Sequence, residues 1–411
     1  MSIIPASSVL AGVDLTDPRT HAERDVRPLF ARLRRDEPVA WHEPPPGRDR
    51  GFWVLSRHAD ALRVSRDTAR FSSARGNMLT TLLGDGDSAG NRMLVVSDAP
   101  RHTVLRTRMR RAFTAEALNE IGDHVRTTTR RLLAAAVLRG AAGEPVDAAR
   151  DIAAHIPLGA ICTMLDVPEA DRPFVLAQTS LALASHEPVP ATRQARLAQA
   201  QLLLYFARLA RTRAASPGRD ALSLLADSGI DEERLSEDEV VLNCYSLILG
   251  GDETTRLAMI GGIRALAENP EQWRRLRDGE VGLSDAVEEV LRGTSPVLHL
   301  GRSLTEDIDL HGRSLAAGDV ATVWIPSANH DEREFTEPDR FDVGRQPNRH
   351  LTFAHGPHFC LGARMARGEL EILLGELRDQ VAELRPAGPA TPVYSAFVGG
   401  SAGLPILMLP A

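Results

Sequence analysis

Lysine is absent from the chain, so all 48 basic residues are arginine. An absence this uniform indicates a GC-rich coding bias, because selection for bidentate anion contacts would act at single sites. The net charge of -7 argues against nucleic acid as the main partner, since phosphate binding needs a basic field. The three cysteines, Cys162, Cys244 and Cys360, are odd in number and far apart, which excludes a disulfide framework and fits a reducing cytosol.

Long apolar runs are also missing. No stretch reaches the roughly 18 to 20 apolar residues that a membrane helix needs, and the first residues lack the basic and apolar regions of a signal peptide. Hydrophobic residues make up 43% and charged residues 25% of the chain, the proportions of a folded globular protein. Repeats and long linkers are absent, so we expect one large domain, residues 1–411, in a cytoplasmic enzyme without a membrane anchor.

Helical patterning dominates the chain. Short β-like runs flanked by turn residues occur at 51–56, 309–314 and 319–324, and they indicate small sheets. We therefore expect a mainly α fold with small β-sheets.

The strongest helix signal covers about 237–269. Ser236 and Glu239 form a capping box in front of it, and Pro270 follows its end. At 1.5 Å per residue such a helix is about 50 Å long, and its broad apolar girdle places it across the centre of the molecule. Its middle, Gly250-Gly251-Asp252-Glu253-Thr254-Thr255, weakens the helix by about 1 kcal/mol per Gly. Either the small residues permit close helix packing, or something large lies against the helix and an acid and a hydroxyl point at it.

A loop at 353–362 delivers Cys360 to the start of a predicted amphipathic helix, where backbone N–H groups and the helix dipole favour a thiolate. A buried, inert cysteine is one alternative. Zinc bound by His355, His358 and Cys360 is another, although no further ligand stands at the customary spacing. Neither alternative explains the glycines around the cysteine.

The pattern Phe353-x-x-Gly356-x-x-x-Cys360-x-Gly362 resembles the haem-binding loop of cytochromes P450. Only Ala354 departs, since Gly is most common there. The resemblance spans about Asp98 to the C-terminus and implies the cytochrome P450 fold, with haem b between the long central helix and the cysteine loop. It implies that Cys360 is the axial iron ligand and that Phe353 and Gly356 belong to the cofactor site.

Further stretches match the family in order. In the segment 98–106, Asp98 reads as an N-cap, and His102 and Arg106 share one helical face. The resemblance implies that His102, Arg106, Arg302 and His358 bind the haem propionates. It also implies that Glu289, Arg292 and Arg340 form a buried structural network beside the cysteine loop.

The resemblance also gives the central helix a role. Gly250 and Gly251 would leave room for dioxygen, Thr254 would position water and the bound oxygen, and Glu253 would relay protons. Family members that use peroxide tend to lack this acid–alcohol pair, so we expect a dioxygen-dependent cycle. No flavin or nicotinamide segment is visible, so the implied partners are a ferredoxin and a ferredoxin reductase.

Substrate-lid loops are expected at about 72–95 and 180–200, including the stretch 186–190. The candidate substrate contacts are Met78, Leu79, Leu82, Leu83, Ser246, Leu249, Val297, Leu298, His299 and Phe397. We expect hydroxylation of a small to medium organic molecule, plausibly in secondary metabolism. Oxidative C–C, C–N or C–O coupling on the same haem iron is an alternative, and a non-catalytic haem carrier or sensor is a second.

Overall fold

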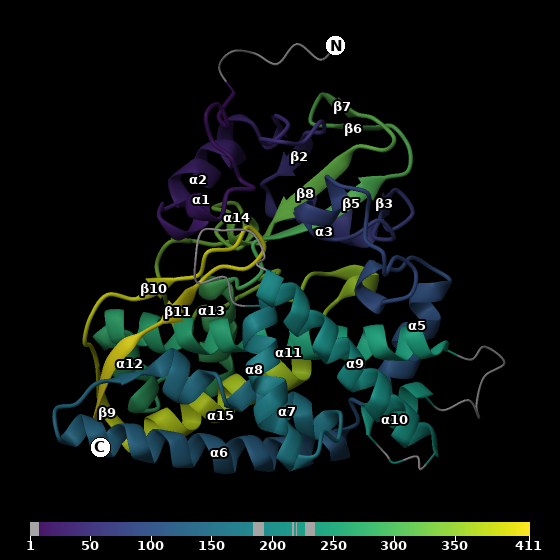
Figure 1. The fold of residues 1–411 in the computed structure, drawn as a ribbon. Helices are drawn as coiled ribbons and strands as arrows, with labels where there is room; N and C mark the ends of the chain where they lie inside the picture. Colours follow the sequence, from purple (N-terminus) through teal and green to yellow (C-terminus); the bar gives the residue numbers. More distant parts are fainter. Residues whose placement is uncertain (1–7, 184–192, 216–217, 219, 227–234) are drawn as a thin grey trace.

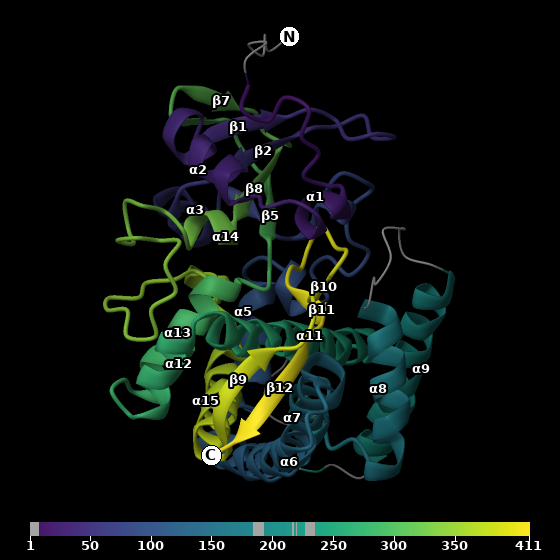
Figure 2. The same cartoon turned by 90° about the vertical axis from the view of Figure 1, so that its left-hand side faces the viewer.

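The computed structural model places one long helix through the middle of the molecule, with most helices below it and the N-terminal strands above it (Figure 1). It describes residues 8–183, 193–215, 218, 220–226 and 235–411. The long helix, α11 (Glu237–Glu268), starts at the Ser236–Glu239 capping box and is continuous through the paired glycines. Figure 2 shows it crossing the centre of the molecule. The predicted central helix is thus confirmed, nearly to its ends.

Helices enclose α11 and bury its apolar girdle. The helices of this part are α5 (Arg101–Arg110), α6 (Ala115–Ala141), α7 (Ile156–Met164), α8 (Arg172–Leu183), α9 (Arg193–Ala215), α10 (Ala221–Ala226), α12 (Pro270–Arg277), α13 (Leu283–Thr294) and α15 (Ala363–Gln380). Side chains of α11, α7, α13 and α15 meet in the largest apolar cluster, which holds Ile248, Ile260 and Ile263. Burial of this kind contributes about 25 cal/mol per Å² of apolar surface, and it explains why α11 tolerates its glycines.

A five-stranded sheet forms the N-terminal end, in the order β1-β2-β8-β5-β3. Its strands are β1 (Val39–His42), β2 (Phe52–Leu55), β3 (Phe71–Ser72), β5 (His299–Leu304) and β8 (Val320–Trp324). The smaller sheets and hairpins use β4 (Val146–Asp147), β6 (Ile308–Leu310), β7 (Arg313–Leu315), β9 (Val381–Pro386), β10 (Thr391–Pro392), β11 (Ser401–Gly403) and β12 (Pro405–Pro410). The predicted strands at 51–56, 309–314 and 319–324 correspond to β2, the β6–β7 hairpin and β8.

Short helices complete the fold. They are α1 (Pro18–Ala22), α2 (Arg27–Asp36), α3 (His58–Arg66), α4 (Leu79–Leu82), α14 (Ile325–Ala328) and the turns η1 (Leu94–Val96), η2 (Ala149–Ala153), η3 (Glu169–Asp171) and η4 (Gly356–His358). The prediction that Asp98 caps α5 is wrong. Pro100 is the N-cap residue, and the Asp98 carboxylate instead accepts a hydrogen bond from the Ser73 N–H at 2.8 Å, because the chain before α5 folds back on the segment after β3.

Candidate active site

Cys360 stands between the turn η4 and the first residue of α15. Its N–H donates to the Phe353 carbonyl at 2.9 Å, which closes the loop. The thiol is solvent-accessible, yet the protein around it raises its pKa by desolvation, while N–H groups of Gly362 and Ala363 and the charges of Arg106 and Arg367 act to lower it. The Cys360 side chain is thus reachable by solvent yet largely surrounded by protein atoms. We infer that it faces an open slot inside the protein.

Backbone geometry explains the glycine in this loop. Gly356 has a φ of +69°, and a Cβ there would lie 2.4 Å from the Ser65 carbonyl oxygen of α3, so both the conformation and the space require glycine. Ala354 has a φ of +57°. The departure from glycine at position 354 therefore places an alanine in a left-handed conformation that L-residues seldom adopt.

Three basic side chains gather beside the slot. The rings of His102 and His358 lie 4.2 Å apart, and burial lowers the pKa of His358 to about 3, helped by the charges of Arg302 and His102. Arg302 is 4% exposed, and burial lowers its pKa to about 10, with Asp98 as the opposing charge. The Nε2 of His102 and the Nε of Arg302 are buried and lack a hydrogen-bond partner within the described part of the chain.

Buried polar nitrogens without partners are expensive, and a buried cation more so. A bound group with two carboxylates would supply the missing acceptors. The donor set, the accessible thiol and the slot between them therefore fit a haem with its propionates toward His102, Arg302 and His358. Arg106 donates to the Phe359 carbonyl at 2.7 Å, so its contact with a propionate stays a prediction.

The middle of α11 also has an accessible face. Gly250 is exposed although it lies mid-helix, and a Cβ at this position would meet no atom within 4 Å. Thr254, one turn later, is partly exposed and donates its hydroxyl hydrogen to the Gly250 carbonyl at 2.7 Å. The prediction for Gly251 is wrong, because a Cβ there would lie 3.1 Å from Ile161 of α7. Gly251 thus permits close packing of α11 against α7, whereas Gly250 leaves open space beside α11.

Acidic residues follow the two glycines. Glu253 is 5% exposed and forms an ion pair with Arg256 at 2.6 Å. Asp252 is 4% exposed, and burial, reinforced by Glu253, raises its pKa to about 7. Sequence reasoning gave Asp252 no role, since no local pattern shows that it points into the core.

Glu289 and Arg292 form the predicted buried pair, with Arg292 Nε 2.8 Å from Glu289 Oε2. The prediction for Arg340 is wrong, because its guanidinium is more than half exposed and pairs with Glu337. Arg345 supplies the second cation instead, with its Nε 3.1 Å from Glu289 Oε2. Arg340 contributes only its carbonyl, which accepts from Arg345 and Arg292.

The lid segment 72–95 is attached to the core at both ends. The Leu79 N–H donates to Nε2 of the buried His299 at 3.1 Å, and the Leu94 N–H donates to Asn243 Oδ1 of α11 at 2.9 Å. Leu79, Leu82 and Leu83 pack in an apolar cluster with Trp324.

A side chain that lines an open cavity would be accessible, as Ser246, Leu249, Val297 and Phe397 are. The predicted substrate contacts of Leu79, Leu82, Leu83, Leu298 and His299 are therefore wrong, because each of these residues is 7% exposed or less. The contact of the partly exposed Met78 stays a prediction. The second lid, 180–200, includes the stretch 186–190, which lies outside the described residues.

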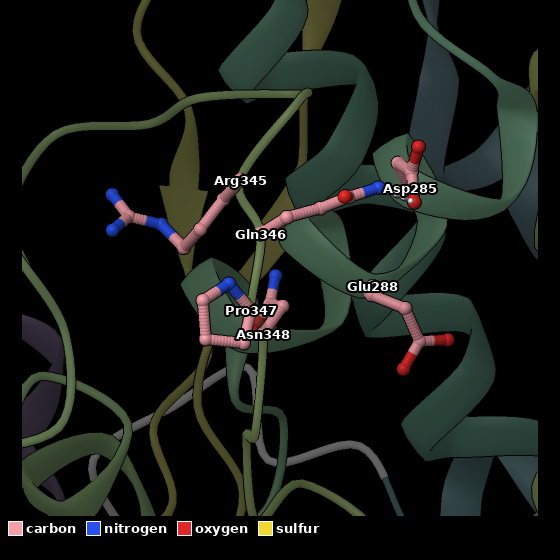
Figure 3. Close-up of a pocket in the computed structure, with 6 residues that line it drawn as sticks. All are labelled: Asp285, Glu288, Arg345, Gln346, Pro347 and Asn348. Carbon is pink, nitrogen blue, oxygen red and sulfur yellow. Dashed lines mark hydrogen bonds between the residues drawn. The ribbon is translucent and has the colours of Figure 1, made fainter.

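A surface pocket is lined by Asp285, Glu288, Arg345, Gln346, Pro347 and Asn348 (Figure 3). It is shallow, and Cys360 and α11 do not line it. Within the described residues, no three His, Cys, Asp or Glu side chains are arranged to hold a metal ion. The zinc alternative for His355, His358 and Cys360 therefore has no support.

This fold and slot define a helix-rich haem protein with a cysteine at the binding loop. The family model of cytochrome P450 matches residues 283–377. Cytochrome P450 NovI of Streptomyces niveus is 44% identical over 399 residues, 97% of each chain. The chain belongs to the cytochrome P450 family. It is therefore a haem-dependent oxidoreductase of the monooxygenase type, which uses dioxygen, an organic substrate and an electron-transfer partner.

Solved structures agree with this assignment. P450 OxyD, involved in the biosynthesis of vancomycin-type antibiotics, superposes with a TM-score of 0.88 at 32% identity and covers 97% of this chain and 100% of its own. The LnmA hydroxylase of the leinamycin pathway from Streptomyces atroolivaceus gives a TM-score of 0.82 at 31% identity, covering 93% of this chain and 96% of its own. Among the described helices, none is long and apolar enough to span a bilayer.

Proposed function

We propose that the chain is a dioxygen-dependent monooxygenase that hydroxylates a small to medium organic molecule in secondary metabolism. The observation that carries this proposal is an exposed Cys360 on the family's binding loop, together with buried nitrogens of His102 and Arg302 that lack partners among the described residues. Two similar structures, OxyD from the biosynthesis of vancomycin-type antibiotics and the LnmA hydroxylase from the leinamycin pathway, support a biosynthetic role.

In this proposal, haem b bound through Cys360 supplies dioxygen activation. The N–H groups of Gly362 and Ala363 and the charges of Arg106 and Arg367 stabilise the Cys360 thiolate. His102, Arg302 and His358 hold the propionates. Phe353 shields the sulfur from the side of the loop.

The residues of α11 deliver protons in the proposed reaction. The Thr254 hydroxyl, anchored to the Gly250 carbonyl, faces the slot and orders water there. Glu253 carries protons from solvent when its carboxylate leaves Arg256. Ser246, Leu249, Val297 and Phe397 line the accessible space above and contact the substrate.

In this proposal a ferredoxin and its reductase supply the two electrons of each turnover. The protein acts in the cytoplasm. Arg106, which contacts the cysteine loop, and the exposed Arg110 of α5 present the charge that an acidic donor would recognise.

Two measurements test this function. The reduced protein with carbon monoxide must show the absorption of thiolate-ligated haem, and Cys360→His must remove it. Turnover under labelled dioxygen must then give a product that contains the label. A coupled product without label would replace hydroxylation by oxidative coupling, and the absence of thiolate-ligated haem would refute the proposal altogether.

A further inference from the structure

Three side chains connect α13 to α15 behind the Cys360 loop, and we call Glu288, His350 and Arg367 the Glu288 cluster. Arg367 Nε lies 2.6 Å from Glu288 Oε1, and its Nη2 lies 2.9 Å from Oε2, so the two groups share a bidentate pair. Nε2 of His350 lies 3.0 Å from Glu288 Oε2. In Figure 3 the Glu288 side chain extends away from the segment 345–348. Its carboxylate is bound within the cluster, although Glu288 also lines the surface pocket.

The hydrogen bonds fix the tautomer of His350. Its Nδ1 accepts from the Thr352 N–H at 3.2 Å, so Nε2 carries the hydrogen and donates it to Glu288. The side chain is 2% exposed, which leaves it no other orientation. Burial acts to raise the pKa of Glu288, but the hydrogen bonds from Arg367 and His350 outweigh it and lower that pKa to about 2. The carboxylate is therefore charged throughout the physiological range.

Arg367 reaches from this anchor onto the Cys360 loop. Its guanidinium lies over the Phe353 ring, 4.5 Å from the ring centroid, in the geometry of a cation–π contact. The Phe353 carbonyl accepts the Cys360 N–H. Two cations are thus held against this loop, Arg367 over the Phe353 ring and Arg106 by the Phe359 carbonyl.

We propose that Glu288 and His350 are positioning residues that hold the Arg367 guanidinium beside the Cys360 thiolate, and that this cation sets how readily the iron bound by Cys360 is reduced. The inference rests on the proposed role of Cys360 as the iron ligand. A positive charge beside the thiolate favours the state that carries one more electron. Loss of that charge must lower the reduction potential.

The size of the effect follows from exposure. The Arg367 side chain is 36% exposed, so solvent screens part of its charge. We expect the equilibrium constant for one-electron reduction to fall about threefold to tenfold in Arg367→Gln, or about 30 to 60 mV at 59 mV per tenfold.

The test is a spectroelectrochemical titration of the ferric–ferrous couple in the purified holoenzyme. Arg367→Lys keeps the charge but cannot form two parallel hydrogen bonds, so its potential should lie between wild type and Arg367→Gln. Arg378→Gln is the matched control and should leave the potential unchanged, since this arginine stands on the same helix and pairs with the exposed Asp379.

Glu288→Ala separates positioning from simple charge. If Glu288 acted only through its charge, its removal would raise the reduction potential. We expect instead that Glu288→Ala releases Arg367 into solvent and so lowers the reduction potential. A rise in Glu288→Ala, or an unchanged potential in Arg367→Gln, overturns the inference.

The carbon monoxide spectrum keeps this result distinct from the proposed function. If the wild type lacks the thiolate absorption, the function itself fails. If every variant keeps that absorption and the potentials do not move, Cys360 remains the ligand and only the role of the Glu288 cluster is refuted.

Discussion

Asp252 is the buried acid whose removal has the clearest thermodynamic consequence. Its side chain lies on the side of α11 that faces Cys162 of α7 and Glu369 of α15, with Glu253 and Arg256 on its own helix. Its Oδ1 and the Oε2 of Glu369 have no hydrogen-bond partner within the described residues. Arg256 already pairs with Glu253. The folded protein therefore retains a proton on Asp252 that the unfolded chain releases.

The sign and size follow from the pKa of about 7 against an ordinary value of 3.8. Below about pH 4 both states carry the proton. Between about pH 4 and 7 only the folded state does, so each pH unit lowers the free energy of unfolding by about 1.4 kcal/mol. The total loss is about 4 kcal/mol, and about 3 kcal/mol of it falls between pH 5 and 8.

Asp252→Asn removes this dependence. Unfolding entropy is about 2.1 cal/mol/K per residue, or about 0.9 kcal/mol/K for 411 residues. The Tm of the variant relative to wild type should therefore rise by about 3 °C from pH 5 to pH 8. Thermal unfolding followed by circular dichroism measures it, and Asp379→Asn, an exposed acid, is the control. A Tm difference that is the same at both pH values would show that Asp252 is not protonated in the folded protein.

Three further predictions concern the site. Thr254→Ala should keep the carbon monoxide spectrum but divert electrons from product to hydrogen peroxide. The amounts of product and of peroxide per NADH consumed measure this, and an unchanged ratio would exclude a role of Thr254 in proton delivery. Glu289→Gln leaves Arg292 and Arg345 buried without a counter-charge. It should lower the free energy of unfolding by about 3 to 5 kcal/mol, and an unchanged midpoint of urea unfolding would contradict this. Gly356→Ala adds about 1 to 3 kcal/mol of backbone strain and a clash with Ser65, so the haem content per protein should fall, and a full haem content would refute the argument.

The central helix could be predicted from the sequence because its signals are local. The capping box at Ser236 and Glu239 fixes the start of α11, and the apolar girdle fixes its burial. The strands β2 and β8 and the β6–β7 hairpin were readable for the same reason, since turn residues flank each run.

The errors in the site prediction share a different cause. Arg340 and Arg345 lie in the same loop. Only the path of the folded chain brings Arg345, and not Arg340, to Glu289. His299 and Leu79 looked like cavity residues, but β5 turns the histidine into the core, where it accepts the Leu79 N–H. Gly250 and Gly251 are adjacent in sequence, yet the helix directs them to different surroundings, Gly250 to open space and Gly251 to Ile161.

The sequence alone determined the class of the protein and the thiol at its centre. The glycines, the cysteine and the helix start of the 353–362 loop are close neighbours along the chain, and their chemistry depends on backbone conformation over a few residues. The tertiary structure decided which cations meet which carboxylates, which nitrogens of His102 and Arg302 are left without partners, and that Asp252 is desolvated. Desolvation and ion pairing depend on groups that lie far apart in sequence, so only the folded chain could fix them.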